Sequence, residues 1–186
     1  MEIICTQNEL NNAIQLVSKA VATKPTHPIL ANILLTADEG TNKISVTGFD
    51  LNLGIQTSFD GTVQNSGAIT IPSKLLSEIV NKLPNESPVS LEVDGNSDNI
   101  LIKSDRGSFN LKGIPSDEYP NLPFVERGTS LNIDPSSFLK ALRSTIFASS
   151  NDESKQLLTG VNFRALKKEL GSIFKEVPLS TNGKFG

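Results

Sequence analysis

The chain has 186 residues, 37% of them hydrophobic, and a formal net charge of -3. This length and hydrophobic content predict one or two domains with a buried core and exclude a disordered tail. The negative charge argues against nucleic-acid binding by the whole surface, but it is compatible with a local basic face on an acidic body.

Cys5 is the only cysteine, which excludes a disulfide framework and a cysteine-ligated zinc cluster and suits a reducing cytosol. It stands in an apolar run, where core packing is the usual role of a cysteine. No stretch approaches the roughly 18 apolar residues that span a bilayer, and the N-terminus lacks the pattern of a secretory signal. We therefore expect a soluble, cytoplasmic protein without membrane contact.

The N-terminal part of the chain predicts a strand, a helix and then three strands. Residues 1–6 are strand-like, and residues 7–22 carry apolar side chains at helical spacing. This helical stripe consists of Leu10, Ile14, Val17 and Val21. The three strands are predicted over residues 29–37, 43–49 and 51–59. A polar link over residues 60–67 follows them.

Two prolines interrupt the chain after the first helix. Pro25 and Pro28 fix φ, remove two backbone donors and disfavour the α region for the residue before each of them, so the helix must end before Lys24. Lys24 is the first candidate for contact with a partner, and a solvated turn lysine is its ordinary alternative. His27 is predicted to be a turn residue rather than a catalytic base.

The same order of elements is predicted a second time from residue 68 onward. A strand over 68–71 leads into a helix that starts at Pro72-Ser73. The apolar stripe of this helix consists of Leu75, Leu76, Ile79, Val80 and Leu83. Three strands follow, over residues 89–93, 99–104 and 108–114. Two copies at a period of about 65 residues predict an α+β fold of duplicated β-α-β-β-β units, with two helices packed on antiparallel sheets.

The stretch 115–123 is rich in proline and polar residues, and it predicts a linker between a domain over 1–125 and a second over 126–186. A third copy starts beyond it, with a strand over 130–133 and a helix opened by Asp134-Pro135. The helix has Phe138, Leu139, Leu142 and Ile146 on one side and Lys140 and Arg143 on the other. A loop over 149–156 and a strand over 157–163 follow. From about residue 165 the repeat is lost, so the second domain is expected to be incomplete, with an atypical tail.

The sequence offers little support for an enzyme. It has one histidine, no glycine-rich nucleotide motif, and a Gly183-Lys184 pair that lacks the upstream spacing of a P-loop. Three acidic pairs, at 38–39, 117–118 and 152–153, fall in predicted turns or loops, where solvated carboxylates are usual. We expect no catalysis, metal or cofactor, although carboxylates that converge in space would make a hydrolase the alternative.

Basic residues accompany each predicted helix and favour a binding function. Such helices can contact phosphates without reading bases, which predicts salt-sensitive, sequence-independent binding of nucleic acid. An ordinary solvated face is the alternative for each helix taken singly. The basic residues are Lys19 and Lys24 after the first helix, Lys74 and Lys82 beside the second, and Lys140 and Arg143 on the third.

Five segments in order resemble one protein family. They are Lys24 to Leu35, Thr47 to Leu51, Ile71 to Leu76, Pro115 to Leu122, and Asp152 to Val161. Together they are similar to the bacterial DNA sliding clamp, the beta subunit of DNA polymerase III. The resemblance covers about residues 1–163 and agrees with the duplicated fold.

The resemblance implies a head-to-tail dimeric ring of six similar domains whose helices surround duplex DNA. Such a ring tethers DNA polymerase III without chemistry of its own, and its partners are duplex DNA, other clamp subunits, the polymerase and the clamp loader. The residues that the likeness places toward DNA are Lys24 and, less directly, Lys74, Arg106, Lys140, Arg143 and Lys155. The residues that it places at the subunit edge are Ile79, Gly107, Ser108, Phe109, Asn110 and Leu111.

The chain also departs from the family. After Gly160-Val161 the family continues with a Thr-Asp-Gly-His-Arg-Leu segment and a third domain, and this sequence does not. The expectation is a truncated clamp subunit that lacks the partner-peptide pocket between the second and third domains and closes a ring poorly. An alternative function is a stand-alone regulator that caps a full-length clamp through the edge of the first domain.

Overall fold

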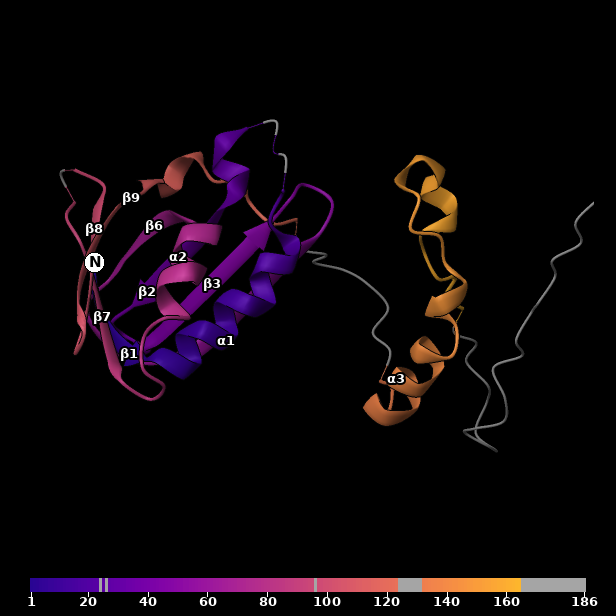
Figure 1. The fold of residues 1–186 in the computed structure, drawn as a ribbon, viewed down its shortest axis with the longest axis horizontal. Helices are drawn as coiled ribbons and strands as arrows, with labels where there is room; N and C mark the ends of the chain where they lie inside the picture. The colour runs from indigo at the N-terminus through magenta and orange to yellow at the C-terminus, as the bar shows by residue number, and fades with distance from the viewer. Residues whose placement is uncertain (24, 26, 96, 124–131, 165–186) are drawn as a thin grey trace, which may run out of the picture. The chain divides into compact units, whose positions relative to one another are not determined.

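The computed structural model describes residues 1–23, 25, 27–95, 97–123 and 132–164. The contacts within the chain divide it into two compact units, Met1–Val125 and Glu126–Gly186 (Figure 1). Each unit has its own architecture.

Two five-stranded antiparallel sheets form the described part of the first unit. One sheet has the order β5-β1-β7-β8-β9, and its strands are β5 (Thr62–Asn65), β1 (Glu2–Thr6), β7 (Pro88–Val93), β8 (Asn99–Ser104) and β9 (Gly107–Lys112). The other has the order β10-β6-β2-β3-β4, and its strands are β10 (Ile114–Pro115), β6 (Gly67–Pro72), β2 (Asn32–Asp38), β3 (Lys43–Phe49) and β4 (Gly54–Asp60).

The two copies of the repeat exchange their first strands. β1 belongs to the first copy but pairs with β7 of the second copy, with Ile3 opposite Leu91. β6 begins the second copy but pairs with β2 of the first, with Leu35 opposite Ile69. The predicted fold of duplicated units on two antiparallel sheets is therefore confirmed, and the exchange joins both copies into one unit.

Two helices, α1 (Gln7–Val17) and α2 (Ser73–Val80), lie side by side across the strands (Figure 1). α1 begins where the Thr6 hydroxyl accepts a hydrogen bond from the Glu9 amide, at 3.3 Å, and donates one to the Glu9 carboxylate, at 2.7 Å. Its α-helical part is shorter than the predicted 7–22, because a 3-10 turn, η1 (Ser18–Ala20), continues it and Val21 is already extended.

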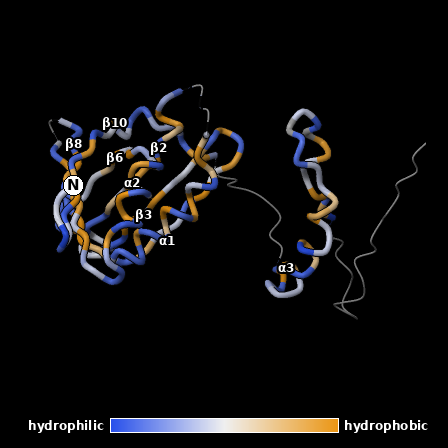
Figure 2. Tube along the Cα trace, viewed as in Figure 1, coloured by the Kyte–Doolittle hydropathy of each residue, from blue (hydrophilic) through white to orange (hydrophobic). Residues whose placement is uncertain are grey.

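The core of the first unit lies between the helices and the inner faces of both sheets, where apolar segments gather (Figure 2). It contains the predicted helical stripes, except that Leu75 is 43% exposed and Val21 is only partly buried. The largest fully buried apolar side chains are Ile3, Leu10, Ile14, Ile33, Leu35, Ile44, Ile71, Leu76, Leu91, Ile100 and Ile102. Burial of this apolar surface is the main stabilising contribution to the unit.

Two segments predicted to be links belong to the fold instead. Part of the polar link 60–67 is β5, which pairs with β1. In the predicted linker 115–123, a 3-10 turn, η3 (Ser116–Glu118), precedes Tyr119, whose side chain is 6% exposed and whose hydroxyl donates to the Thr47 carbonyl at 3.4 Å. Hydrogen bonds and one buried aromatic residue therefore hold segments that composition alone assigns to loops.

Two predicted strands start later than expected. The strand predicted over 29–37 begins at Asn32, because η2 (Pro28–Ala31) forms a 3-10 turn before it. The strand predicted over 51–59 begins at Gly54. The preceding turn is closed by Asp50, whose carboxylate accepts hydrogen bonds from the amides of Asn52 and Leu53 at 2.8 and 2.7 Å.

The second unit contains α3 (Pro135–Arg143), as predicted, and two 3-10 segments, η4 (Ile146–Ala148) and η5 (Glu153–Leu158). The Asp134 carboxylate caps α3 by accepting from the Ser137 amide at 2.8 Å. The strand predicted over 157–163 is wrong, since no strand pairing holds it in the described part of this unit. Residues 132–133 are not a strand either, and residues 130–131 and the tail from 165 lie outside the described residues.

The three helices carry apolar residues at the same positions but bury them differently. The fourth residue of each helix is Leu10, Leu76 or Phe138, and these are 0%, 0% and 36% exposed. Phe138 packs edge-to-face with Phe163, with ring centroids 5.7 Å apart. Within the described residues, the stripe of α3 is thus less buried than the stripes of α1 and α2, which pack in the core between two sheets.

We expect Leu10→Ala and Leu76→Ala to lower the free energy of unfolding of the first unit by about 2–5 kcal/mol, because each leaves a cavity in a closed core. Phe138→Ala should change it by less than about 0.5 kcal/mol, since Phe138 belongs to the other unit. Denaturant unfolding followed by the fluorescence of Tyr119, the only tyrosine of the chain, measures the change. Leu75→Ala is the matched control, and an effect as large as that of Leu76→Ala would contradict the assigned core.

Candidate nucleic-acid interface

α1 and α2 run antiparallel, with the start of one beside the end of the other. The Gln7 side chain, at the start of α1, donates to the Val80 carbonyl at 2.8 Å, at the end of α2. At the opposite end, the hydroxyls of Ser18 and Ser73 are hydrogen-bonded at 2.9 Å. The N-terminus of α2 and the C-terminal turn of α1 therefore form one end of the helix pair.

Neutral polar side chains line the contact between the two helices. The Gln15 amide donates to the Asn81 side-chain carbonyl at 3.3 Å, and the Asn81 amide donates to the Ser77 hydroxyl at 3.2 Å. The side-chain carbonyl oxygens of Gln7 and Asn11 are buried and have no hydrogen-bond partner among the described residues. Hydrogen-bonding side chains therefore join the two helices in addition to the apolar core that they share.

Two lysines lie at the Ser18–Ser73 end of this seam. Lys19 and Lys74 each directly follow one of the hydrogen-bonded serines, and both are exposed. Neither forms an ion pair within the described part of the chain. Lys43 and Lys103 differ, because they pair with carboxylates of Asp60 and Glu92 at 2.6 Å. Two exposed lysines that form no ion pair among the described residues therefore lie at this end of the helix pair.

A glycine in the sheet allows the end of α1 to approach. A Cβ atom at Gly48, in β3, would overlap the backbone carbonyl of Val17, the last residue of α1. Glycine is therefore required here for close packing, and it sets the position of the turn that carries Lys19. Gly48 belongs to one of the segments that carry the family resemblance, and its packing role was not predicted.

The other predicted DNA-facing residues are more scattered. Lys24 lies outside the described residues, and its role stays a prediction. Arg106 is exposed in the turn between β8 and β9, and not on a helix. Lys140 and Arg143 are exposed on the last turns of α3, in the second unit.

Lys155 is exposed within η5, where its backbone departs from helical geometry. Its ammonium group is 3.9 Å from a carboxylate oxygen of Asp152. The pKa of Asp152 is lowered, because its carboxylate accepts hydrogen bonds from the side chain and the backbone amide of Ser154. The positive charge of Lys155 is thus partly offset by an exposed acidic neighbour.

The predicted subunit edge divides into exposed and buried residues. β9 is the last strand of its sheet, and Gly107 to Asn110 are exposed along it, with Phe109 36% exposed. Leu111 and Ile79 are 7% and 8% exposed and pack in the core. Residues 107–110 therefore form the exposed edge of the sheet. Ile79 and Leu111 are buried and leave little surface for contact with another subunit.

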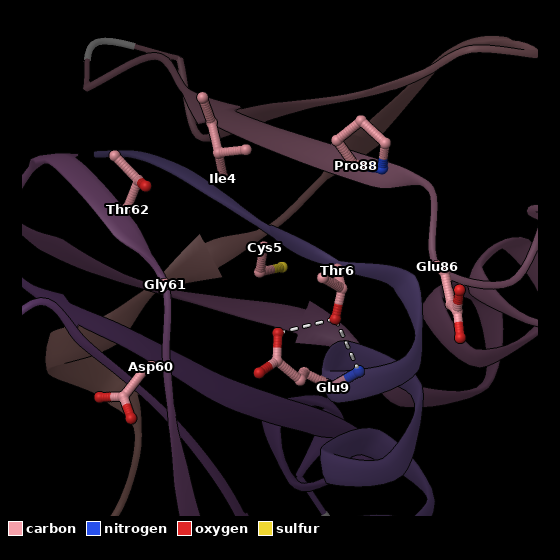
Figure 3. Close-up of a pocket in the computed structure, with 9 residues that line it drawn as sticks. All are labelled: Ile4, Cys5, Thr6, Glu9, Asp60, Gly61, Thr62, Glu86 and Pro88. Carbon is pink, nitrogen blue, oxygen red and sulfur yellow. Dashed lines mark hydrogen bonds between the residues drawn. The ribbon is translucent and has the colours of Figure 1, made fainter.

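A cavity of about 450 Å³ lies near the start of α1, with Cys5 at its wall (Figure 3). Its carboxylates include Glu9, which is hydrogen-bonded to Thr6, and Asp60, which is paired with Lys43. Burial, reinforced by Glu9, raises the pKa of the Cys5 thiol to about 12. The described part of the chain contains no group of three or more His, Cys, Asp or Glu residues that could hold a metal ion. Its helices are also too short or too polar to cross a membrane.

Comparison with known proteins identifies the family of this chain. The family described as DNA polymerase III beta subunit, N-terminal domain, matches residues 1–123. The chain belongs to this family. The beta sliding clamp of Synechococcus elongatus is 49% identical over 164 residues, and the match covers 88% of this chain and 43% of the relative. The beta sliding clamp of Bacillus subtilis is 37% identical over 180 residues, covering 91% of this chain and 46% of the relative.

The fold agrees with solved members of the family. The crystal structure of the DNA polymerase sliding clamp from Bacillus subtilis superposes with a TM-score of 0.78 at 33% identity, covering 86% of this chain and 43% of that one. The recognition of a sliding-clamp sequence and of its α+β fold is therefore confirmed. The chain spans less than half the length of these relatives.

Cys5 should resist alkylation in the folded protein. With a pKa of about 12, almost none of the thiol is ionised at pH 8, and only the thiolate attacks iodoacetamide. We expect labelling at least about 100-fold slower than in the denatured chain, where the pKa returns toward its usual value of ~8.5. Mass spectrometry of timed samples measures both rates, and rapid native labelling would contradict the burial of this thiol.

Proposed function

We propose that this chain acts in DNA replication as a sliding-clamp subunit, with the α1–α2 pair of its first unit facing duplex DNA. The observation that carries the proposal is that Lys19 and Lys74, both exposed, lie at the end of the helix pair where Ser18 and Ser73 are hydrogen-bonded. The names of its relatives, beta sliding clamps, supply the class of function.

The chemistry of this surface suits sequence-independent contact. Exposed ammonium groups attract phosphates and release their counterions, without reading base edges. The neutral amides and hydroxyls between the helices can exchange hydrogen bonds with water and phosphate oxygens without fixing one register. Such contacts hold a duplex near the helices while it moves along them.

The β9 edge is the part of the first unit that we assign to another clamp subunit. Its exposed residues 107–110 leave strand hydrogen-bonding groups available for an added strand. Phe109 adds an aromatic ring at the same edge. In this proposal the chain carries out no catalysis, and its partners are duplex DNA, clamp subunits and the replicative polymerase.

Lys19→Glu combined with Lys74→Glu should weaken binding of a labelled 40-base-pair duplex at low salt by about tenfold or more. The slope of log K against log salt should fall by about 0.9 for each lysine that contacts a phosphate. Fluorescence anisotropy over a salt series measures both quantities.

Lys43→Glu combined with Lys103→Glu is the charge-matched control, since both ammonium groups are already paired, with Asp60 and Glu92. It should change affinity less than about twofold.

The combined change of Lys24, Lys140 and Arg143 to Glu extends the assay to the other predicted contacts. Unchanged binding in the variant at Lys19 and Lys74 and in this triple variant would refute the basic helix face as the DNA contact.

Phe109→Asp should abolish association with a full-length clamp subunit, because it places a charge at the edge where a strand would add. The test is co-purification of the tagged chain with the Synechococcus elongatus clamp, followed by sedimentation at micromolar concentration. Leu75→Asp, on an equally exposed residue of α2, is the control and should retain association. Loss of association with both variants, or with neither, would remove β9 as the subunit contact.

A further inference from the structure

A second cavity, of about 530 Å³, opens on the first unit, and none of its lining residues is among those assigned to DNA or to β9. Four separate parts of the chain line it: the η2 corner, the turn before β4, β10, and the end of η3 with the residues after it. Its walls include Ile29 and Leu30 from the corner, Leu51 from the turn and Ile114 from β10. The volume is within the range of pockets that hold side chains of a ligand.

Hydrogen bonds on two sides hold this pocket in shape. Leu51 has φ of 77°, a left-handed conformation that is unfavourable for leucine, and the Asp50 carboxylate holds it through the two amides that follow. Its side chain is 53% exposed and lines the pocket instead of entering the core. Strain that exposes an apolar side chain costs stability, which favours a binding role for it.

The opposite wall is positioned by Tyr119. Its ring is buried and its hydroxyl bonds to the Thr47 carbonyl, so the neighbouring Glu118 and Pro120 are left to line the pocket. Glu118 is exposed and forms no ion pair within the described residues. Asp117 lies beside it, and no lysine or arginine is among the lining residues. The pocket therefore has mostly apolar walls, and its polar side chains are the imidazole of His27 and the carboxylate of Glu118.

We propose that this pocket binds a peptide segment of a partner protein, in which a leucine or phenylalanine side chain is followed by arginine or lysine. The apolar side chain fills the space between Leu51 and Ile114, and the cation pairs with Glu118 at the rim. Complementarity of charge identifies this occupant, since an acidic segment would meet the Glu118 carboxylate. The inference goes beyond DNA and subunit contact and uses none of their residues.

Three fluorescein-labelled peptide amides test the pocket in the full chain: acetyl-Gly-Leu-Phe-Arg-Lys-Gly, the same peptide with Glu-Asp in place of Arg-Lys, and the same peptide with Ala-Ala in place of Leu-Phe. The first should bind saturably in an anisotropy titration, and each of the other two about tenfold more weakly. No DNA is present, so failure here leaves the proposed clamp function unaffected.

Two matched pairs of variants locate the site. Leu51→Arg should weaken the first peptide about tenfold or more, and Leu53→Arg, a similarly exposed leucine that does not line the pocket, less than about twofold. Glu118→Lys should weaken it about threefold and reduce the preference for basic over acidic peptide, whereas Glu39→Lys, in an exposed turn, should change neither.

Absence of saturable binding, equal affinity for basic and acidic peptides, or equal loss with Leu51→Arg and Leu53→Arg would overturn the proposal. The pocket could instead be occupied by a second copy of this chain, and sedimentation of the peptide-free chain tests that alternative. A dimer that Leu51→Arg dissociates and Leu53→Arg does not would assign the pocket to a second copy and would also overturn it.

Discussion

The pairing of β1 with β7, and of β6 with β2, is the constraint on which the first unit depends. Each of these strands begins one copy of the repeat and hydrogen-bonds into the sheet of the other copy. Because α1 and α2 follow β1 and β6 without a loop, the exchange also sets the two helices antiparallel and side by side. The apolar residues of both copies then form one core, and neither copy can bury its own without the other.

This arrangement also decides where charge is left uncompensated. The antiparallel helices place the end of α1 beside the start of α2, so Lys19 and Lys74 lie at the same end of the helix pair although they are distant in the sequence. On the sheets, by contrast, Lys43 and Lys103 lie beside carboxylates and add little net potential. A chain of net charge -3 therefore carries a local basic surface, whose reach in solution is about 8–10 Å at physiological salt.

Predictions from the sequence succeeded where structure depends on local pattern. Helical spacing predicted α1, α2 and α3, because an amphipathic helix shows its period in its own residues. β5 was missed, and the strand predicted over 108–114 is divided between β9 and β10 in different sheets, because backbone hydrogen bonds to β1 and β6 hold β5 and β10 without apolar alternation. The apolar run over 157–163 was predicted to be a strand and is not one. A strand requires a partner strand as well as a suitable composition.

The sequence by itself determined the order of most helices and strands, the duplication and the membership of the clamp family, all of which follow from periodicity and matching segments. Only the tertiary structure decided that the first strands exchange, that Leu111 belongs to the core, and that Lys19 and Lys74 lie at the same end of the helix pair. It also placed Leu51 opposite Ile114 and Glu118 around a pocket. The physical reason is that a helical period is contained within one segment, whereas strand pairing, burial and the proximity of charges join residues that are far apart in the chain.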